Sequence, residues 1–264
     1  MRHRAKKRFG QNFLVDRNII EKIIACIAPR ADDRLVEIGP GLGALTCPLL
    51  EAIDHIDAIE LDRDVIPRLQ QNCRHHPGLR IHGVDVLKFD FAELHQHRQR
   101  LRIIGNLPYN ISTAVLFLLL TQRAWIIDMH FMLQKEVVER IASPAGCHAY
   151  SRLSVMMQTF FDTTPLFDVP ASCFSPAPKV ESAIIRLQPH QRFSQDIDDS
   201  ERYATLVRTA FAQRRKTLRN TLKPLCTEAQ ITAAGIDPQT RAEQLHIEDF
   251  VRLHRQLSTA TPAD

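Results

Sequence analysis

Short apolar runs alternate with helical patterns along the first half of the chain, and this alternation limits the folds available to it. Buried strands are predicted at 35–38, 56–60, 79–84, 102–104 and 126–133. Helices are predicted around them, at 17–27, 44–51, 64–72, 113–120 and 136–141, the first capped by Asp16. Strands and helices that alternate at this spacing form a doubly wound, mainly parallel sheet. The sequence therefore predicts an α/β fold of the Rossmann-like kind.

The pattern changes after Pro189. Before it, later strands are predicted at 154–161 and 182–187, the second after a proline-rich segment. Beyond it no strand is predicted, and helical spacing recurs at 201–212, 214–222, 228–234 and 247–257. A chain of 264 residues has room for one good-sized domain and a smaller one. We therefore expect a domain at 1–189 and a small α-helical domain at 190–264.

Composition restricts where such a chain works. No run of about 18 apolar residues is present, so a membrane span is not expected. The basic N-terminus lacks the apolar stretch of a secretory signal. The six cysteines include no C-x-x-C pair, a pattern that favours reduced thiols over disulfides or a zinc site. We expect a cytoplasmic protein without a metal.

The net charge of +4 is modest, but the basic residues are clustered. Acid-free basic runs occupy 2–8 and 208–223, the second including Arg214, Arg215, Lys216 and Arg219. Such runs are commonly ordinary solvated faces. Two of them in a chain with 30 acidic residues favour a polyanionic partner, with these four residues as candidate contacts.

A glycine-rich loop follows the first strand of the predicted sheet. Gly39, Gly41 and Gly43 remove side chains where a ligand can approach the backbone. Glu60 comes 21 residues after Gly39, where dinucleotide-binding folds place the acid that binds ribose hydroxyls. The loop by itself fits a dehydrogenase and a methyltransferase equally well.

Two further acids favour the methyltransferase. Glu37 precedes the loop and suits a cationic group, such as a sulfonium with its amino-acid tail, better than a pyrophosphate. Asp85 follows the third strand and is placed to bind an adenine amine at the ligand-binding edge of the sheet. The alternative is that these acids simply face solvent at strand ends.

The fourth strand is followed by Asn106-Leu107-Pro108-Tyr109, after Gly105 has let the chain break away. Pro108 keeps Leu107 out of the helical region, so the Leu107 carbonyl can project beside the Asn106 amide. Two adjacent acceptors suit an amino group with two N–H bonds, and Tyr109 offers a face for a planar base. The motif therefore predicts a pocket for a nucleobase amine; the alternative is a strand followed by a proline turn.

With these residues in view, the chain resembles the rRNA adenine dimethyltransferase family nearly from end to end. The segments that carry the resemblance are RFGQNFL at 8–14, EIGPGLG at 37–43, ELD at 60–62, Asp85, NLPYN at 106–110, QKEV at 134–137, FSPAPKVESA at 174–183 and FAQRRKTL at 211–218. Any one of them can occur by chance, but all of them in this order are highly specific.

The resemblance implies an S-adenosylmethionine-dependent enzyme that dimethylates two adjacent adenosines in the 3′-terminal hairpin loop of small-subunit rRNA, within a subunit assembly intermediate. It implies cofactor contacts from six residues: Asn12, Leu14, Gly39, Glu60, Asp85 and Asn106. Phe174 is a candidate for the second face of the target base, or else a core residue. We expect a monomer. The alternatives are an enzyme for large-subunit rRNA, and an assembly factor whose catalysis is secondary.

Overall fold

The computed structural model describes residues 11–94 and 100–259, which form two compact units. The first holds Met1–Val138 and Thr164–Pro189, and the second holds Glu139–Thr163 and His190–Asp264. This division differs from a single boundary near residue 190, because Glu139–Thr163 belongs to the second unit together with His190–Asp264. The basic run at 2–8 lies outside the described residues.

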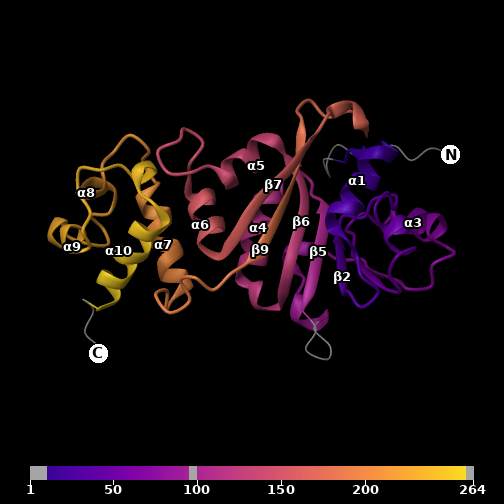
Figure 1. Ribbon diagram of the computed structural model, residues 1–264, viewed down its shortest axis with the longest axis horizontal. Coiled ribbons are helices and arrows are strands. Elements are labelled where there is room, and N and C mark those ends of the chain that lie inside the picture. The colour runs from indigo at the N-terminus through magenta and orange to yellow at the C-terminus, as the bar shows by residue number, and fades with distance from the viewer. Residues whose placement is uncertain (1–10, 95–99, 260–264) are drawn as a thin grey trace. The chain divides into compact units, whose positions relative to one another are not determined.

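A seven-stranded sheet with the order β4-β3-β2-β5-β6-β9-β7 runs through the fold (Figure 1). Its strands in chain order are β2 (Leu35–Ile38), β3 (Ile56–Ile59), β4 (Leu79–His82), β5 (Leu101–Asn106), β6 (Ile126–Gln134), β7 (Phe161–Val169) and β9 (Ser182–Pro189). The pairs from β4 to β6 are parallel, and β9 joins β6 antiparallel. The predicted α/β class and its mainly parallel sheet are confirmed.

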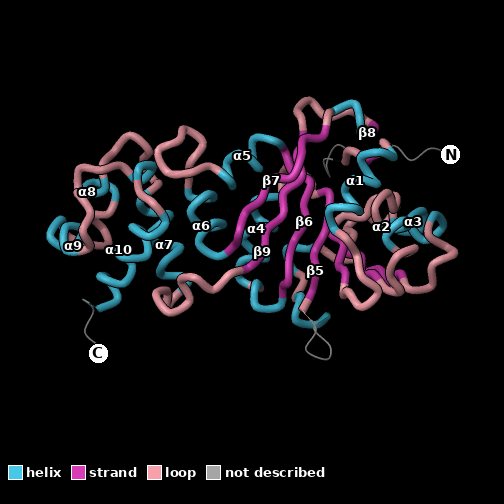
Figure 2. Tube along the Cα trace, in the orientation of Figure 1, coloured by secondary structure: helices cyan, strands magenta, loops and turns pink. Residues whose placement is uncertain are grey.

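Figure 2 shows the helices of this part of the fold in cyan. They are α1 (Arg17–Ile27), α2 (Thr46–Leu49), α3 (Ile66–Asn72), α4 (Ser112–Thr121) and α5 (Lys135–Ala142), of which α2, α3 and α4 lie between successive parallel strands. The Asp16 carboxylate caps α1 by accepting a 3.1 Å hydrogen bond from the backbone N–H of Ile19. Ile23 and Ile27 of this helix belong to the core cluster that also contains Leu35 of β2. Burial of this apolar stripe holds the helix on the sheet.

Gly105 lies inside β5 rather than at a break after it, which corrects the sequence interpretation. A Cβ built on Gly105 would lie 2.4 Å from the carbonyl oxygen of Ile38 on the neighbouring β2. Glycine is required there because β2 and β5 approach each other closely just before they end at the ligand-binding edge of the sheet.

The second unit is helical, with α6 (Arg152–Phe160), α7 (Ser200–Ala210), α8 (Leu218–Thr221), α9 (Glu228–Ala233) and α10 (Ile247–Thr259). The prediction of a strand at 154–161 was wrong, because these residues form most of α6. The Ser154 hydroxyl accepts from the backbone N–H of Ser151 at the start of that helix, a capping contact. The strand begins only at Phe161.

The prediction of a single helix at 214–222 was also wrong. Only α8 is helical in this range, and the backbone N–H groups of Leu218 and Arg219 donate to the carbonyls of Thr240 and Pro238. These donors are therefore satisfied by a distant segment instead of by a preceding helical turn.

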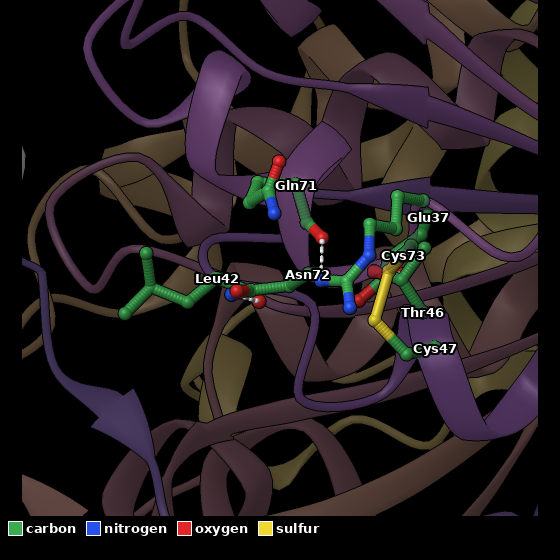
Figure 3. The surroundings of a disulfide bond; sticks show 8 residues. Glu37, Leu42, Thr46, Cys47, Gln71, Asn72 and Cys73 are labelled. Carbon is green, nitrogen blue, oxygen red and sulfur yellow. Dashed lines mark hydrogen bonds between the residues drawn. A yellow bond between two sulfur atoms is a disulfide. The ribbon is translucent and has the colours of Figure 1, made fainter.

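Cys47 of α2 and Cys73, directly after α3, form a disulfide (Figure 3). Beside it, the Asn72 side chain donates a 2.8 Å hydrogen bond to the Leu42 carbonyl, so the C-terminal end of α3 is tied both to α2 and to the glycine loop. The expectation of six reduced thiols was wrong for this pair, because spacing along the chain does not reveal which cysteines the fold brings together. The other four are free: Cys26, Cys147, Cys173 and Cys226.

Among the described residues, no helix has both the length and the apolar sequence needed to cross a bilayer.

Candidate active site

A cavity of about 570 Å³ opens at the carboxyl ends of the parallel strands. Five segments line it, at 11–15, 37–45, 59–61, 84–87 and 106–111. β2 and β5 are neighbours in the sheet although β3 and β4 lie between them in sequence, so the strand order reverses between β2 and β5. Ligands of doubly wound folds bind at this kind of switch point, and the volume suits a small organic molecule.

Glu37, the third residue of β2, lines the cavity and has only 2% of its surface exposed. Its carboxylate accepts a 2.6 Å hydrogen bond from the Thr46 hydroxyl. Burial raises the pKa of Glu37 to about 7, with a smaller contribution from the nearby Glu60 charge, and the Thr46 bond opposes the rise. Among the described residues no Lys, Arg or His is paired with it. A buried carboxylate without a cationic side chain beside it is best stabilised by a cationic group of a ligand.

The glycine loop closes one side of the cavity. Gly39, Gly41 and Gly43 all have positive φ, and a Cβ on Gly41 would touch the Phe13 ring at 3.2 Å. Glu60 accepts from the N–H groups of Gly41 (3.4 Å) and Asp62 (2.8 Å), so its carboxylate braces the loop. Burial raises its pKa, and these hydrogen bonds counter part of the rise.

Asp85 lies three residues beyond the end of β4, not on the strand itself. One of its oxygens accepts a 3.0 Å hydrogen bond from the Leu87 N–H and caps the short 3₁₀ helix Val86–Lys88. The residue still lines the cavity together with its neighbours Val84 and Leu87. The capping contact fixes the carboxylate at the rim and leaves its second oxygen for a ligand.

Asn106 ends β5 and lines the same cavity as the glycine loop. Its Nδ2 donates a 3.1 Å hydrogen bond to the Asn12 carbonyl, which turns Oδ1 the other way as an acceptor. Leu107 is buried, and its N–H donates to the Met132 carbonyl at 3.2 Å. Pro108 and Tyr109 complete this wall.

Tyr109 is held at two points. Its phenol oxygen lies 2.7 Å from the Ser182 hydroxyl, and its backbone carbonyl accepts from the Ser112 hydroxyl at 3.2 Å. Burial raises the pKa of Tyr109, so the phenol stays protonated at neutral pH.

Phe174 occupies a different environment. It is 4% exposed, belongs to the core cluster with Leu14 and Met132, and is missing from the described residues that line the cavity. Its short strand β8 (Phe174–Ser175) pairs antiparallel with β1 (Phe13–Leu14), whose residues do line it. Phe174 is therefore a core residue in this structure and not part of the cavity wall. Asn12 and Leu14 both reach the cavity.

The four basic candidates belong to the second unit. Arg215, Lys216 and Arg219 are exposed. Arg214 is engaged within the unit, because its guanidinium pairs with Glu243 at 2.9 Å and donates to the His148 carbonyl. Charge is therefore available to an external partner mainly from the other three.

Two residues that hold side chains of the site in place were not predicted from the sequence. Thr46 holds Glu37, and Ser182 holds Tyr109, across separations of nine and 73 residues. Ser182 stands in a segment already noted as family-like, but nothing in the local sequence assigns it a partner.

Comparison with known proteins agrees with this geometry. The family model described as ribosomal RNA adenine dimethylase matches residues 2–259. A ribosomal RNA small subunit methyltransferase A from Chromohalobacter salexigens is 51% identical over 264 residues, covering 98% of this chain and 94% of that protein.

Two solved structures share the fold. A dimethyladenosine transferase from Plasmodium falciparum has a TM-score of 0.77 and 26% identity, covering 91% of this chain and 95% of its own. The 23S rRNA methyltransferase ErmE has a TM-score of 0.71 and 25% identity, covering 94% of this chain and 100% of its own. The family model spans almost the whole sequence, and the chain belongs to the ribosomal RNA adenine dimethylase family.

Proposed function

We propose that this protein transfers methyl groups from S-adenosylmethionine to the exocyclic amines of two adjacent adenosines in the 3′-terminal hairpin loop of small-subunit rRNA. The observation that carries the proposal is a single cavity. It joins the glycine loop and buried Glu37 to the paired acceptors of Asn106 and Leu107. The relative at 51% identity is named for the small subunit, which selects that rRNA over the large-subunit one.

The residues of the cavity fit the cofactor. Glu37 suits its cationic amino-acid end, Glu60 lies beside the glycine loop where ribose hydroxyls bind, and Asp85 stands at the rim for the adenine amine. The positive φ of Gly39 and Gly41 lets the backbone approach the ligand closely. When bound, the cofactor supplies an electrophilic methyl group on a sulfonium that is already a good leaving group.

The chain's own contribution is positioning. An adenine amine is a weak nucleophile because its lone pair is delocalised into the ring. Acceptance of its two N–H bonds by Asn106 Oδ1 and the Leu107 carbonyl favours the pyramidal nitrogen that attacks. The Asn12 carbonyl fixes Asn106 in the accepting orientation before substrate arrives, so little reorganisation is needed.

The target base has to leave its stack to enter the cavity, at a cost of a few kcal/mol that is smaller in a loop than in a duplex. Stacking on Tyr109 offsets about 1–3 kcal/mol of that cost. A second stacking role for Phe174 would require its buried ring to leave the core, so Tyr109 carries this role in the proposal.

The remaining features of the proposal concern the RNA and its context. Arg215, Lys216 and Arg219 give the second unit an exposed basic surface suited to phosphates. The substrate is an assembly intermediate of the small subunit, met by a monomeric enzyme in the cytoplasm.

The test supplies tritiated S-adenosylmethionine to small-subunit particles that lack the modification, with large-subunit particles in parallel, and maps the labelled nucleotides. Two adjacent dimethylated adenosines near the 3′ end of small-subunit rRNA are expected. Label in the large-subunit rRNA alone would support the second candidate, an enzyme of the ErmE kind, which the shared fold makes reasonable. Absence of label in both would refute the proposal.

A further inference from the structure

We infer that Ser182 is a positioning residue for the methyl transfer: its hydroxyl holds the Tyr109 ring in the cavity wall as a fixed surface on which the target base stacks. The inference rests on the proposed function, since it concerns how the same site receives its base. It adds a residue from a strand that does not line the cavity among the described residues.

The geometry is that of a direct bond. The two hydroxyl oxygens are 2.7 Å apart, within the usual range for O–H···O hydrogen bonds. Ser182 has no exposed surface, so water does not compete for its hydroxyl. Each hydroxyl can donate and accept, and the pair satisfies both groups where burial would otherwise be costly.

Ser182 is itself rigidly held. It begins β9 and pairs in register with Gln134 of β6, in the antiparallel ladder of the central sheet. Next to it, the backbone N–H of Lys135 donates to the Glu181 carbonyl at 3.0 Å, and the Lys135 ammonium lies 3.5 Å from the Glu181 carboxylate. The Tyr109 ring is thus anchored to the sheet, although its backbone belongs to the loop between β5 and α4.

Anchoring at both ends fixes the two side-chain torsions of Tyr109. The Ser112 hydroxyl holds its backbone carbonyl, and Ser182 holds the far end of its ring. A ring fixed before the base arrives loses no rotamer freedom on binding, which is the advantage of a preorganised site. Without the Ser182 bond, the loop position would let the ring turn toward solvent.

The same bond limits what Tyr109 can do. Its hydroxyl is engaged with Ser182 and is therefore not offered to the substrate, and its pKa is raised by burial. Tyr109 consequently acts through the face of its ring and not as an acid or base. A hydroxyl is needed only to reach Ser182, which accounts for tyrosine in place of phenylalanine.

The experiment is a double-mutant cycle of Ser182→Ala and Tyr109→Phe, measured as single-turnover methylation of unmodified small-subunit particles. Each single variant is expected to lose about fivefold in rate, the equivalent of one hydrogen bond. The double variant should be no slower than either single variant, because both remove the same bond. Affinity for S-adenosylhomocysteine should change less than twofold. A matched control is Ser154→Ala, which removes an equally buried serine hydroxyl from α6 and should be additive with Tyr109→Phe.

A second readout follows the base directly. 2-Aminopurine at the target position fluoresces less when it stacks on an aromatic ring, so both single variants should raise its bound-state fluorescence. If Ser182→Ala fails to fold, Tyr109→Phe alone must show the rate loss and the fluorescence change, since it leaves Ser182 in place.

The outcomes separate the two ideas. Methylation by the wild-type enzyme with independent, multiplicative effects of the two variants would overturn the role of Ser182 and leave the proposed function standing. A Tyr109→Phe variant with the wild-type methylation rate would also overturn the role of Ser182 and leave the proposed function standing. Failure of the wild-type enzyme to methylate the particles would remove both.

Discussion

The side-chain amide of Asn106 donates a 3.1 Å hydrogen bond to the backbone carbonyl of Asn12, 94 residues earlier in the chain. This bond joins the segment before α1 to the end of β5 across the cavity. It also decides which atom of the amide faces the ligand, because a carbonyl can only accept. The acceptor orientation that the proposed chemistry needs is therefore set by the fold.

Affinity for S-adenosylmethionine should depend on pH through Glu37, whose pKa is raised by burial to about 7. An ionised Glu37 attracts the cationic ligand, so affinity should rise as pH increases through 7 and fall by up to about tenfold per unit below it. Calorimetric titration between pH 6 and 8 measures this. Glu37→Gln should flatten the profile; an unchanged slope in that variant would assign the titration to another group.

Ionisation of Glu37, which should raise the affinity for the ligand, should lower the stability of the ligand-free protein. Its folded-state pKa lies above the unfolded value of 4.5, so the folded state binds the proton more tightly. The unfolding free energy should therefore decrease as pH rises from about 4.5 to 7, relative to Glu37→Gln. Thermal unfolding of the two proteins across this window checks the sign, and a difference that grows in the other direction would contradict the burial argument.

Gly105→Ala should be strongly destabilising, because the added methyl would lie 2.4 Å from the Ile38 carbonyl oxygen. Overpacking of this kind costs about 1–3 kcal/mol or more, and β2 and β5 would have to separate at the cavity edge. Gly83→Ala is the matched control, since its Cβ would meet Ile66 at an ordinary 3.4 Å. Urea unfolding of both variants measures the difference; equal stabilities would show that β2 and β5 are not so close.

The disulfide between Cys47 and Cys73 should be detectable by a thiol count in denaturant without reductant. Four reactive thiols are expected, and six after reduction. Because the crosslink closes a loop of 26 residues, its reduction should lower the unfolding free energy by about 3 kcal/mol. Six thiols in the unreduced protein would contradict the pairing.

Reversal of charge at Arg215 and Lys216 should weaken RNA binding while leaving affinity for S-adenosylhomocysteine unchanged. If both contact phosphates, the slope of log affinity against log salt should become shallower by about 1.4, from roughly 0.7 per phosphate on single strands. Arg30→Glu, an exposed charge of the first unit, is the control. Unchanged RNA affinity at moderate salt would reduce these residues to a solvated face.

The five parallel strands were predictable from sequence because apolar residues recur in short segments at a spacing that alternates with helical patterns. Glu37, the glycine loop and Asn106 followed from that, since their position relative to the strands fixes the edge they occupy. Local patterns sufficed for this part of the site.

The parts of the fold and of the site that could not be predicted depend on contacts between segments that are distant in sequence. α6 was mistaken for a strand because nearly every residue of Arg152–Phe160 is buried, which removes the helical alternation of polar and apolar faces. The backbone of 218–219 is satisfied by 238–240, and Ser182 reaches Tyr109 from another strand. The burial of Phe174 likewise depends on the pairing of β8 with β1.

The most direct test of the paired-acceptor site is single-turnover methylation by Asn106→Ala, alongside its affinity for S-adenosylhomocysteine. Loss of one oriented contact to the reacting amine should lower the rate by about 10²-fold or more, while ligand affinity falls by less than about tenfold, and Asn220→Ala, an exposed asparagine of the second unit, should match the wild type. A near-normal rate in Asn106→Ala, or a loss of ligand binding as large as the loss of rate, would contradict the assignment.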